Sequence, residues 1–476
     1  MRPYETAASE SLSPAEVAGL ARRLTGPVVL PGDAGFDAEC ATFNLATPMR
    51  PAVAIGATTE ADVREAVRFA ADRALPIAVL TTGHQVVNRA RGAVLITLSR
   101  MDAVEVEPVA GIARVQGGAR WSQVTERAGE SGLAGVSAAS PTVGVAGYHL
   151  GGGHSPILGR TQGYAADHVR ALRLVTADGA LREVTADAEP ELFWGVRGGK
   201  GNFGVVTSME FALFPVRSFY GGGLFFAGEH ASTVLHTWRE WVPALPREMS
   251  SSIAFRHRSR PAEFVVHVRF SSLGSPAEAK AALARLRALA QTVRDTVAET
   301  AYRDGHRLHL DPSAPVGWLE RLAALRSFPA EAADALLAVA GPDSGTEPGF
   351  VELRALGGAL ADEPAVPNAV AGRGAPWALV ASGGREAGAR LDALVETLAP
   401  WSQDERNANL LAAGDATTPA EVRAAYGSAR YERLAQLKRR HDPQNLFRVN
   451  HNIAPAASPP VPWTARPWTA RWPRIE

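Results

Sequence analysis

Between residues 50 and 215, short apolar runs alternate with segments in which apolar residues recur every three or four positions. The first such segment runs from Val63 to Ala74 and follows Thr59, with Asp62 three residues after the threonine. Threonine followed at this spacing by an acidic residue is a pattern that caps the start of a helix. The apolar run at 77–80 then has the length of a buried strand. This alternation predicts an α/β arrangement in this part of the chain.

The rest of this region predicts further strands and contains one irregular stretch. We expect strands at 93–99 and 112–116, a helix at 121–132, a hairpin over 169–184 around Asp178-Gly179, a short helix at 190–199 and a strand from 201. Residues 133–163 are too rich in glycine and other turn residues to form one regular element. A stretch of that length inside a compact domain is usually a functional loop or a disordered one.

A different pattern begins after residue 219. Strand-like segments such as 263–270 and 350–356 alternate with alanine-rich helical segments such as 275–293. That order favours an α+β domain in which helices cover one face of an antiparallel sheet. Near the end, residues 431–453 predict an amphipathic helix stopped by Asp442-Pro443, and its apolar stripe needs a surface to cover it.

These patterns divide the chain into five parts. We expect an N-terminal segment at 1–44 that packs on the first domain, the first domain at 45–215, a second domain at 216–425, a C-terminal segment at 426–455 that returns to the first domain, and a Pro/Trp/Arg-rich tail at 456–476. Low-complexity tails of this kind are usually poorly ordered. The alternative is a basic, aromatic tail that binds a partner or nucleic acid.

The composition excludes several classes of protein. Forty-nine basic residues balance forty-nine acidic ones, so no global field favours nucleic acid or an anionic membrane. Cys40 is the only cysteine, which excludes an intrachain disulfide and argues against a metal site built on thiolates. The first residues lack a signal-peptide pattern, and no apolar run is long enough to span a membrane. We expect a cytoplasmic protein without a metal.

Two features suggest a bound ligand. The run at 77–80 ends in Thr-Thr-Gly-His-Gln, and a turn needs no histidine, so His84 calls for a reason beyond the turn itself. Glycine clusters at 151–153 and 198–202 fit neither a Walker A nor a GxGxxG pattern. Glycine nevertheless lets a backbone approach a bulky ligand, and consecutive amides can bind pyrophosphate. Together these features suggest an extended dinucleotide touched at several points.

Five motifs in order give the sequence a family resemblance: TTGHQ (81–85), SPTVGVAGYHLGGG (140–153), ADHV (166–169), ELFWGVRGGKGNFGVVT (191–207) and RLAQLKRRHDPQNLFRVNHNI (433–453). The chain resembles the berberine bridge enzyme-like flavoproteins of the p-cresol methylhydroxylase/vanillyl-alcohol oxidase superfamily. The resemblance implies an α+β fold, with a two-part FAD-binding domain of the p-cresol methylhydroxylase type at 45–215. It also implies a substrate-binding domain at 216–425, which is the α/β part with the antiparallel sheet.

The resemblance implies a role for His84, since relatives attach the histidine at this position covalently to the 8α-methyl of FAD. Many relatives also attach a cysteine just before PTVG, where this chain has Ser140. Serine cannot form a thioether, so we expect attachment through His84 alone. Val143 lies where residue size governs oxygen access in relatives, and valine there is typical of oxidases. The expected FAD contacts are Thr81, Thr82, Gly83, His84, Gln85, Ser140, Pro141, Thr142, Val143, Gly144, Gly147, Tyr148, Gly151, Gly152, Gly204, Val205, Val206, Asn450 and Asn452.

The catalytic residues are harder to assign. The Tyr-x-Asn motif, whose tyrosine often serves as the base in relatives, aligns with residues 407–409, Asn-Ala-Asn. Glu352 and Arg354 share one face of the strand predicted at 350–356, where they could orient or deprotonate a substrate hydroxyl above a flavin. The alternative is a solvated sheet edge. Tyr148 could reach the same space, or could be a packing or FAD contact.

The resemblance implies an FAD-dependent oxidase of a small organic or natural-product substrate. Hydride would pass from an alcohol, hemiacetal or amine carbon to the flavin, and O2 would be reduced to H2O2. One alternative is a dehydrogenase with another electron acceptor. Another is a non-redox cyclase or flavin-holding binding protein of the same fold, because a fold alone does not define a function.

Overall fold

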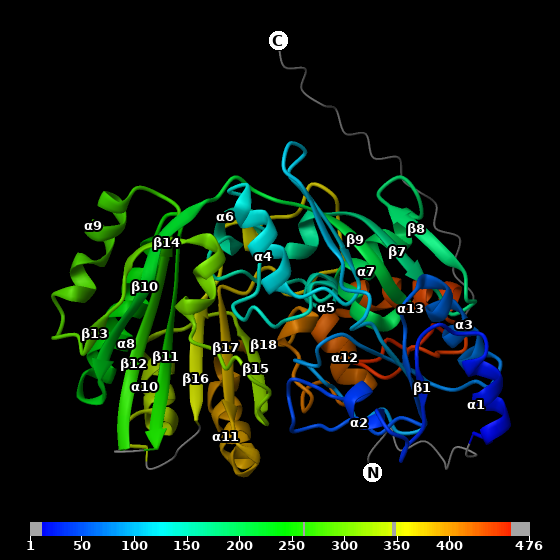
Figure 1. Cartoon of the computed structure of the whole chain (residues 1–476). Coiled ribbons are helices and arrows are strands. Elements are labelled where there is room, and N and C mark those ends of the chain that lie inside the picture. The colour runs from blue at the N-terminus through cyan, green and yellow to red at the C-terminus, as the bar shows by residue number, and fades with distance from the viewer. Residues whose placement is uncertain (1–11, 260–261, 345–348, 458–476) are drawn as a thin grey trace.

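The computed structural model describes residues 12–259, 262–344 and 349–457, and two units lie side by side in it (Figure 1). The Pro/Trp/Arg-rich tail from 458 onward and the first eleven residues lie outside the described residues. The first unit contains two sheets and the second unit contains one. No helix within the described ranges is long and apolar enough to cross a membrane.

A four-stranded sheet in the order β1-β2-β4-β3 opens the first unit. Its strands are β1 (Val28–Val29), β2 (Val53–Gly56), β3 (Ile77–Leu80) and β4 (Val94–Thr97), and its helices are α1 (Pro14–Ala21), α2 (Phe36–Glu39) and α3 (Glu60–Ala71). β2 and β3 each run parallel to β4. The expected cap of α3 is confirmed, since Thr59 and Asp62 each accept a hydrogen bond from the other's backbone N–H.

The second sheet of this unit is antiparallel, in the order β5-β6-β9-β7-β8. Its strands are β5 (Val104–Glu107), β6 (Ile112–Gln116), β7 (Val169–Val175), β8 (Leu181–Thr185) and β9 (Val205–Ala212), with helices α4 (Trp121–Glu130), α5 (Val145–Leu150), α6 (Gly159–Gln162) and α7 (Pro190–Gly199). The segment 133–163 is not a plain loop, because α5 and α6 lie within it. Helices of six and four residues are too short to produce a periodic pattern in the sequence.

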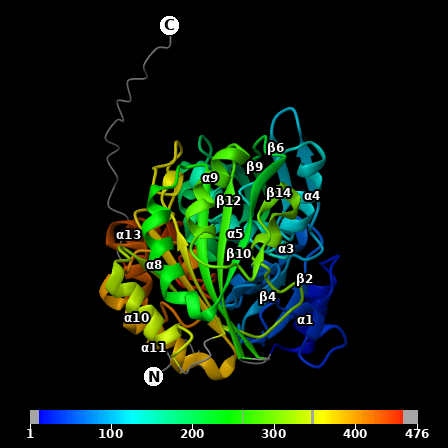
Figure 2. The same ribbon diagram turned by 90° about the vertical axis from the view of Figure 1, so that its left-hand side faces the viewer.

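The second unit is built on a nine-stranded antiparallel sheet with the path β13-β10-β12-β11-β16-β17-β15-β18 and β14 on β10. The strands are β10 (Ser218–Ala227), β11 (Met249–Ser259), β12 (Ala262–Ser272), β13 (Arg294–Asp295), β14 (Ala298–Ala301), β15 (Leu319–Leu325), β16 (Phe350–Ala355), β17 (Trp377–Gly383) and β18 (Ser402–Gln403). Helices α8 (Ala231–Trp241), α9 (Pro276–Arg287), α10 (Ala330–Ala340) and α11 (Gly388–Leu398) cover one face (Figure 2). The expected α+β fold class is confirmed.

Side chains on β16 alternate between two surroundings. Val351, Leu353 and Ala355 pack into the core beneath the helices, whereas Glu352 and Arg354 lie on the opposite face. β16 pairs with β11 on one side and β17 on the other, and Glu352 is fully buried. The alternative of a solvated sheet edge is therefore wrong, because this strand lies inside the sheet.

The C-terminal helices, α12 (Pro419–Tyr426) and α13 (Ser428–His441), lie with the first unit (Figure 1). Leu434 and Leu437 join the core of that unit, and α13 packs against α7. The helix stops at Asp442, whose carboxylate accepts the N–H groups of Leu446 and Phe447 and pairs with the buried Lys438 at 2.7 Å. After α13 the chain returns to the four-stranded sheet, where Leu446 and Phe447 join its core and Ile77 of β3 donates its N–H to the Leu446 carbonyl at 2.8 Å.

Candidate active site

A cavity of about 770 Å³ lies between the two units. Ligand clefts generally measure about 300–1,000 Å³, so this one is large enough for an extended molecule. Three loops and helix α5 of the first unit form one wall, at residues 81–88, 138–150 and 200–206. Strands β15, β16 and β17 of the second unit form the facing wall. The polar face of the large sheet therefore looks onto the glycine-rich segments.

The turn after β3 is held against the segment that precedes β2. Phe43 and Asn44 donate backbone hydrogen bonds to the carbonyls of Thr82 and Gly83, at 2.9 and 3.0 Å. Gly83 has φ +70°, and a Cβ there would lie 2.6 Å from Cβ of Thr42. Only glycine fits this left-handed, crowded position. The tight turn places the next residue, His84, on the cavity wall.

His84 is fixed from three sides. Its ring stacks on Phe43 with centroids 3.9 Å apart, and Trp318 of the second unit lies 6.5 Å from it. Nε2 shares a hydrogen bond of 2.9 Å with the Thr142 hydroxyl, which in turn contacts the Ser140 hydroxyl at 2.9 Å. Burial lowers the pKa of His84 to about 4, so the imidazole is neutral at pH 7. A neutral, oriented imidazole can act as a nucleophile.

Open backbone and unpaired polar atoms on the same wall fit a large polar cofactor. A Cβ added to Gly147 on α5 would meet no atom within 4 Å, although this glycine lines the cavity. The Tyr148 hydroxyl and the side-chain oxygen of Asn450 are buried without a hydrogen-bond partner in the described part of the chain. Buried polar atoms are rarely left unpaired in the functional state of a protein.

The cavity brings together most of the expected FAD contacts. Those that line it are Thr81, Thr82, Gly83, His84, Gln85, Ser140, Val143, Gly144, Gly147, Tyr148, Gly204, Val206 and Asn450. Six do not line it: Pro141, Thr142, Gly151, Gly152, Val205 and Asn452. Thr142 is hydrogen-bonded to the His84 ring and does not reach the cavity itself. The side chains of residues 409 and 407 cover Gly151 and Gly152, and Val205 belongs to the hydrophobic core.

The three expected catalytic residues, Glu352, Arg354 and Tyr148, line the same cavity. Glu352 accepts hydrogen bonds from Ser252 at 2.8 Å, Arg269 at 2.5 Å and Arg354 at 2.8 and 2.9 Å, and Nε2 of His309 lies 3.3 Å from the same carboxylate. Burial alone would raise the pKa of Glu352, but Arg354, Arg269 and His309 hold it well below its usual range. Its lone pairs are occupied, which makes it a poor proton acceptor.

Glu320 on β15 is a cavity residue that the sequence analysis missed. Burial raises the pKa of this carboxyl, and the Trp318 side chain and the charge of Arg354 oppose that shift. Lys200 and Arg354 are the cations that act on it electrostatically. Lys200 donates a hydrogen bond to the Gln85 side chain, and burial lowers its pKa to about 8. The sequence LERLAAL around Glu320 is typical of a helix, which hid a strand with a cavity-facing carboxyl.

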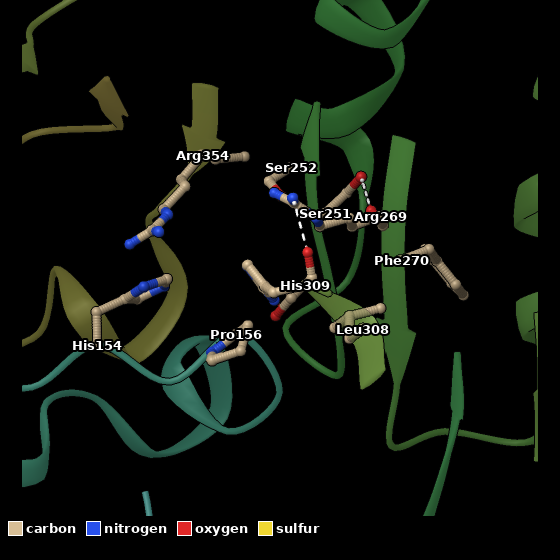
Figure 3. A pocket seen from close by; sticks show the side chains of 11 residues that line it. His154, Pro156, Ser251, Ser252, Arg269, Phe270, Leu308, His309 and Arg354 are labelled. Atoms are coloured by element: carbon tan, nitrogen blue, oxygen red, sulfur yellow. Dashed lines mark hydrogen bonds between the residues drawn. The ribbon is translucent and has the colours of Figure 1, made fainter. Parts of the chain in front are cut away.

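The segment that aligns with the Tyr-x-Asn motif supports the backbone of α5. The Asn409 side chain donates to the carbonyl of Tyr148 at 2.7 Å, and the Asn407 side chain accepts the N–H of Asn409 at 3.1 Å. Neither amide can act as a base. His154, a second residue missed from the sequence, lines the main cavity and faces Arg354 in a small pocket that shares this wall (Figure 3).

Together, the glycine-bounded cavity, the neutral histidine and the unpaired polar atoms define a site for an extended nucleotide cofactor. No group of three or more His, Cys, Asp or Glu residues in the described ranges is placed to hold a metal ion.

Comparisons with known proteins identify the nucleotide cofactor and the protein family. Residues 51–185 match the family described as FAD binding domain, and residues 413–454 match the one described as berberine and berberine like. The chain is 30% identical to (R)-6-hydroxynicotine oxidase of Paenarthrobacter nicotinovorans over 480 residues, covering 91% of this chain and 98% of that protein. The chain therefore belongs to the berberine bridge enzyme-like family of FAD-linked oxidoreductases, as the motifs implied.

Solved structures agree with this family. The structure of 6-hydroxy-D-nicotine oxidase from Arthrobacter nicotinovorans matches with a TM-score of 0.80 and 26% identity, over 91% of this chain and 98% of that one. Berberine bridge enzyme from Eschscholzia californica matches with a TM-score of 0.79 and 18% identity, over 93% and 99% of the two chains. The protein is an FAD-dependent oxidoreductase.

Gly147 provides a test of where the cofactor lies. Gly147→Val should leave the stability of the apoprotein within about 1 kcal/mol of wild type, because nothing in the fold occupies that space. It should weaken FAD binding at least tenfold, about 1.4 kcal/mol, because the side chain would enter the cavity. Thermal unfolding of the apoprotein and the ratio of flavin to protein measure the two effects.

Gly374→Val is the matched control. A Cβ at Gly374 also meets no atom within 4 Å, but this glycine lies away from the cavity lining. It should leave both stability and flavin content unchanged. Wild-type FAD affinity in Gly147→Val would place the cofactor elsewhere.

Proposed function

We propose that the protein is an FAD-dependent oxidase that removes a hydride from an alcohol, hemiacetal or amine carbon of a small molecule and passes the electrons to O2. One observation carries the proposal. A single cavity joins the His84 turn and the open glycines of the first unit to Glu320 on the sheet of the second, a carboxyl whose pKa is raised by burial. Relatives named as oxidases of a hydroxynicotine and of a carbohydrate support a small-molecule substrate.

When bound at the His84 wall of the cavity, FAD would supply the two-electron chemistry, accepting a hydride from the substrate carbon and passing both electrons, with two protons, to O2 as H2O2. The protein has to bind the substrate, exclude water and accept the proton that leaves the substrate O–H or N–H. Glu320 is the residue suited to accept that proton. It faces the cavity, and its raised pKa brings its basicity closer to neutral pH.

Glu352 and Glu320 have different tasks in this account. Two carboxyl groups whose surroundings push their pKa values apart commonly divide the acid–base work of a site. Glu352 stays ionised between Arg269 and Arg354 and positions the second of these side chains. Arg354 then orients the substrate, and Tyr148 lies on the facing wall of the cavity.

His84 is proposed to carry FAD through a ring nitrogen, and Ser140 excludes a second attachment through a thioether. Support comes from the neutral, stacked imidazole at the end of the Gly83 turn. Val143 is proposed to leave room for O2. Its side chain borders the cavity, and its backbone carbonyl accepts the N–H of Trp121 at 3.0 Å. The proposed role of Val143 therefore depends on the volume of its side chain.

The attachment can be tested on denatured protein. After acid precipitation the protein should stay yellow, and the peptide that contains His84 should carry one FAD-sized mass increment. His84→Ala should still bind FAD, because the turn amides remain, and it should be reduced more slowly by substrate. Complete release of flavin from the acid-treated wild type would rule out the attachment.

Oxygen use can be tested by stopped flow. Photoreduced wild-type protein mixed with aerated buffer should recover its flavin absorbance within seconds and release one H2O2 per flavin. Val143→Leu should slow this recovery on the order of tenfold, about 1.4 kcal/mol, with much less effect on reduction by substrate. Val143→Ala is the control and should recover as fast as wild type. Recovery over many minutes in the wild type would favour a dehydrogenase or a non-redox protein.

The role of Glu320 can be tested through the pH dependence of flavin reduction. The substrate is any alcohol or amine that reduces the flavin in an anaerobic screen. The base must be ionised, so kcat/KM should rise with pH through the raised pKa of Glu320 and level off above it. Glu320→Gln should lose that rise and slow reduction by about 10²–10⁴-fold. Glu352→Gln, the control, should be slower than wild type but keep the rise. An unchanged pH profile in Glu320→Gln would remove Glu320 from this role.

A further inference from the structure

The polar face of the large sheet contains a buried group of charges that do not balance. Glu352 lies between two guanidinium groups, those of Arg269 and Arg354. Side-chain exposure is 0% for Glu352, 1% for Arg269 and 24% for Arg354, and the exposed part of Arg354 borders the cavity. One carboxylate thus faces two cations that are largely removed from water.

Neighbouring side chains do not restore the balance. Arg256 adds a third guanidinium to this wall and donates to the carbonyl of His309 at 2.7 Å. Burial lowers the pKa of His154 to about 3, with Arg354 adding to the effect, and burial likewise lowers the pKa of His309. These rings are neutral at pH 7. Two further carboxyl groups act on Arg354: Asp311, which is exposed, and Glu320, whose pKa is raised by burial.

An uncompensated charge in a buried place is costly, and proteins generally pair such charges. The Arg354–Glu352 contact uses Nε and Nη2 of the guanidinium, at 2.9 and 2.8 Å from one oxygen. Nη1 makes no hydrogen bond to any residue in the described ranges. In Figure 3 the Arg354 side chain extends from its strand toward His154, away from Ser252 and Arg269. A donor of the right charge is therefore presented to the cavity.

Tyr148 adds a second donor on the facing wall. Its hydroxyl is buried without a partner among the described residues, and Tyr148 and Arg354 are close enough to influence each other electrostatically. Burial raises the pKa of Tyr148 well above its usual value, so the phenol keeps its proton. The ring is fixed edge-on to Trp121 at 5.5 Å. A cation and a fixed hydroxyl donor thus border the same space.

We propose that Arg354 and Tyr148, with His154 beside them, form a subsite for an anionic oxygen of the substrate, such as a carboxylate or a phenolate. The inference rests on the proposed function, and it narrows the substrate to an organic acid that carries an oxidisable alcohol or amine carbon. Glu352 is the positioning residue, since it holds two nitrogens of Arg354 and leaves the third for the ligand. Charge-assisted bonds to guanidinium are among the stronger hydrogen bonds in proteins.

Arg354 can be replaced without leaving Glu352 unpaired. In Arg354→Gln, Glu352 keeps Arg269, His309 and Ser252, so the buried carboxylate remains paired. The variant removes the charge of Arg354 and leaves the Glu352–Arg269 ion pair, which has no net charge. It should therefore unfold at the same temperature as wild type or at a higher one. Arg354→Lys keeps the charge with different geometry. Arg256→Gln removes one charge from the same wall and serves as the matched control.

The probe pair is benzoate and benzamide, which have nearly the same shape and differ in charge. Each is titrated into the oxidised holoprotein at low ionic strength, and binding is followed by the change in flavin absorbance. Wild type should bind benzoate at least tenfold more tightly than benzamide. Arg354→Gln should lose that preference, Arg354→Lys should keep part of it, and Arg256→Gln should change it less than threefold.

The outcomes separate this inference from the proposed function. Equal benzoate and benzamide affinities in wild type, or an undiminished preference in Arg354→Gln, would overturn the subsite. A lowered reduction potential of the flavin in Arg354→Gln, together with unchanged benzoate binding, would also overturn it. The charge of Arg354 would then stabilise the reduced flavin and would not bind the anion. Oxygen use and H2O2 release are measured without benzoate, so the oxidase proposal can fail while the subsite stands.

Discussion

The site depends on one constraint, the alternation of side-chain direction along each strand of the nine-stranded sheet. Each strand directs successive side chains to opposite faces, so one face can be apolar under helices while the other is polar. On β16, Leu353 packs under the helices, while its neighbours Glu352 and Arg354 border the cavity. A shift of register by one residue would place two charges in an apolar core, at a large cost in free energy. The hydrophobic core therefore fixes the position of the polar wall.

The two units contribute unlike halves of the site. The first supplies backbone: the tight Gly83 turn and the uncovered Gly147 leave room for a large planar cofactor. The second supplies charged side chains on a sheet, where neighbouring strands hold them firmly. Glu352 illustrates the benefit, since donors from β11, β12 and β16 converge on one carboxylate. A site assembled this way can vary its substrate by changing the sheet and leave the cofactor wall unaltered.

Much of the first unit could be predicted from local patterns. The cap at Thr59, the hairpin at Gly179 and the turn before His84 depend on neighbours within a few residues, and the structure confirms each of them. Long-range order could not be predicted in this way. The polar face of β16 was identified correctly, but its place inside the sheet depends on strand order, which no single strand encodes. Glu320 was missed because LERLAAL has strong helix propensity and only the pairing of β15 with β17 makes it a strand.

The central claim is that the flavin lies in the cavity between the units, with its ring between the His84 turn and the polar face of the sheet. A crystal structure of the purified yellow protein tests this most directly. The account predicts continuous density from the His84 ring into an isoalloxazine that faces β15, β16 and β17, with Gly147 against it. Density for FAD outside this cavity, or a flavin ring separated from Glu320 and Arg354 by the protein core, would contradict the account.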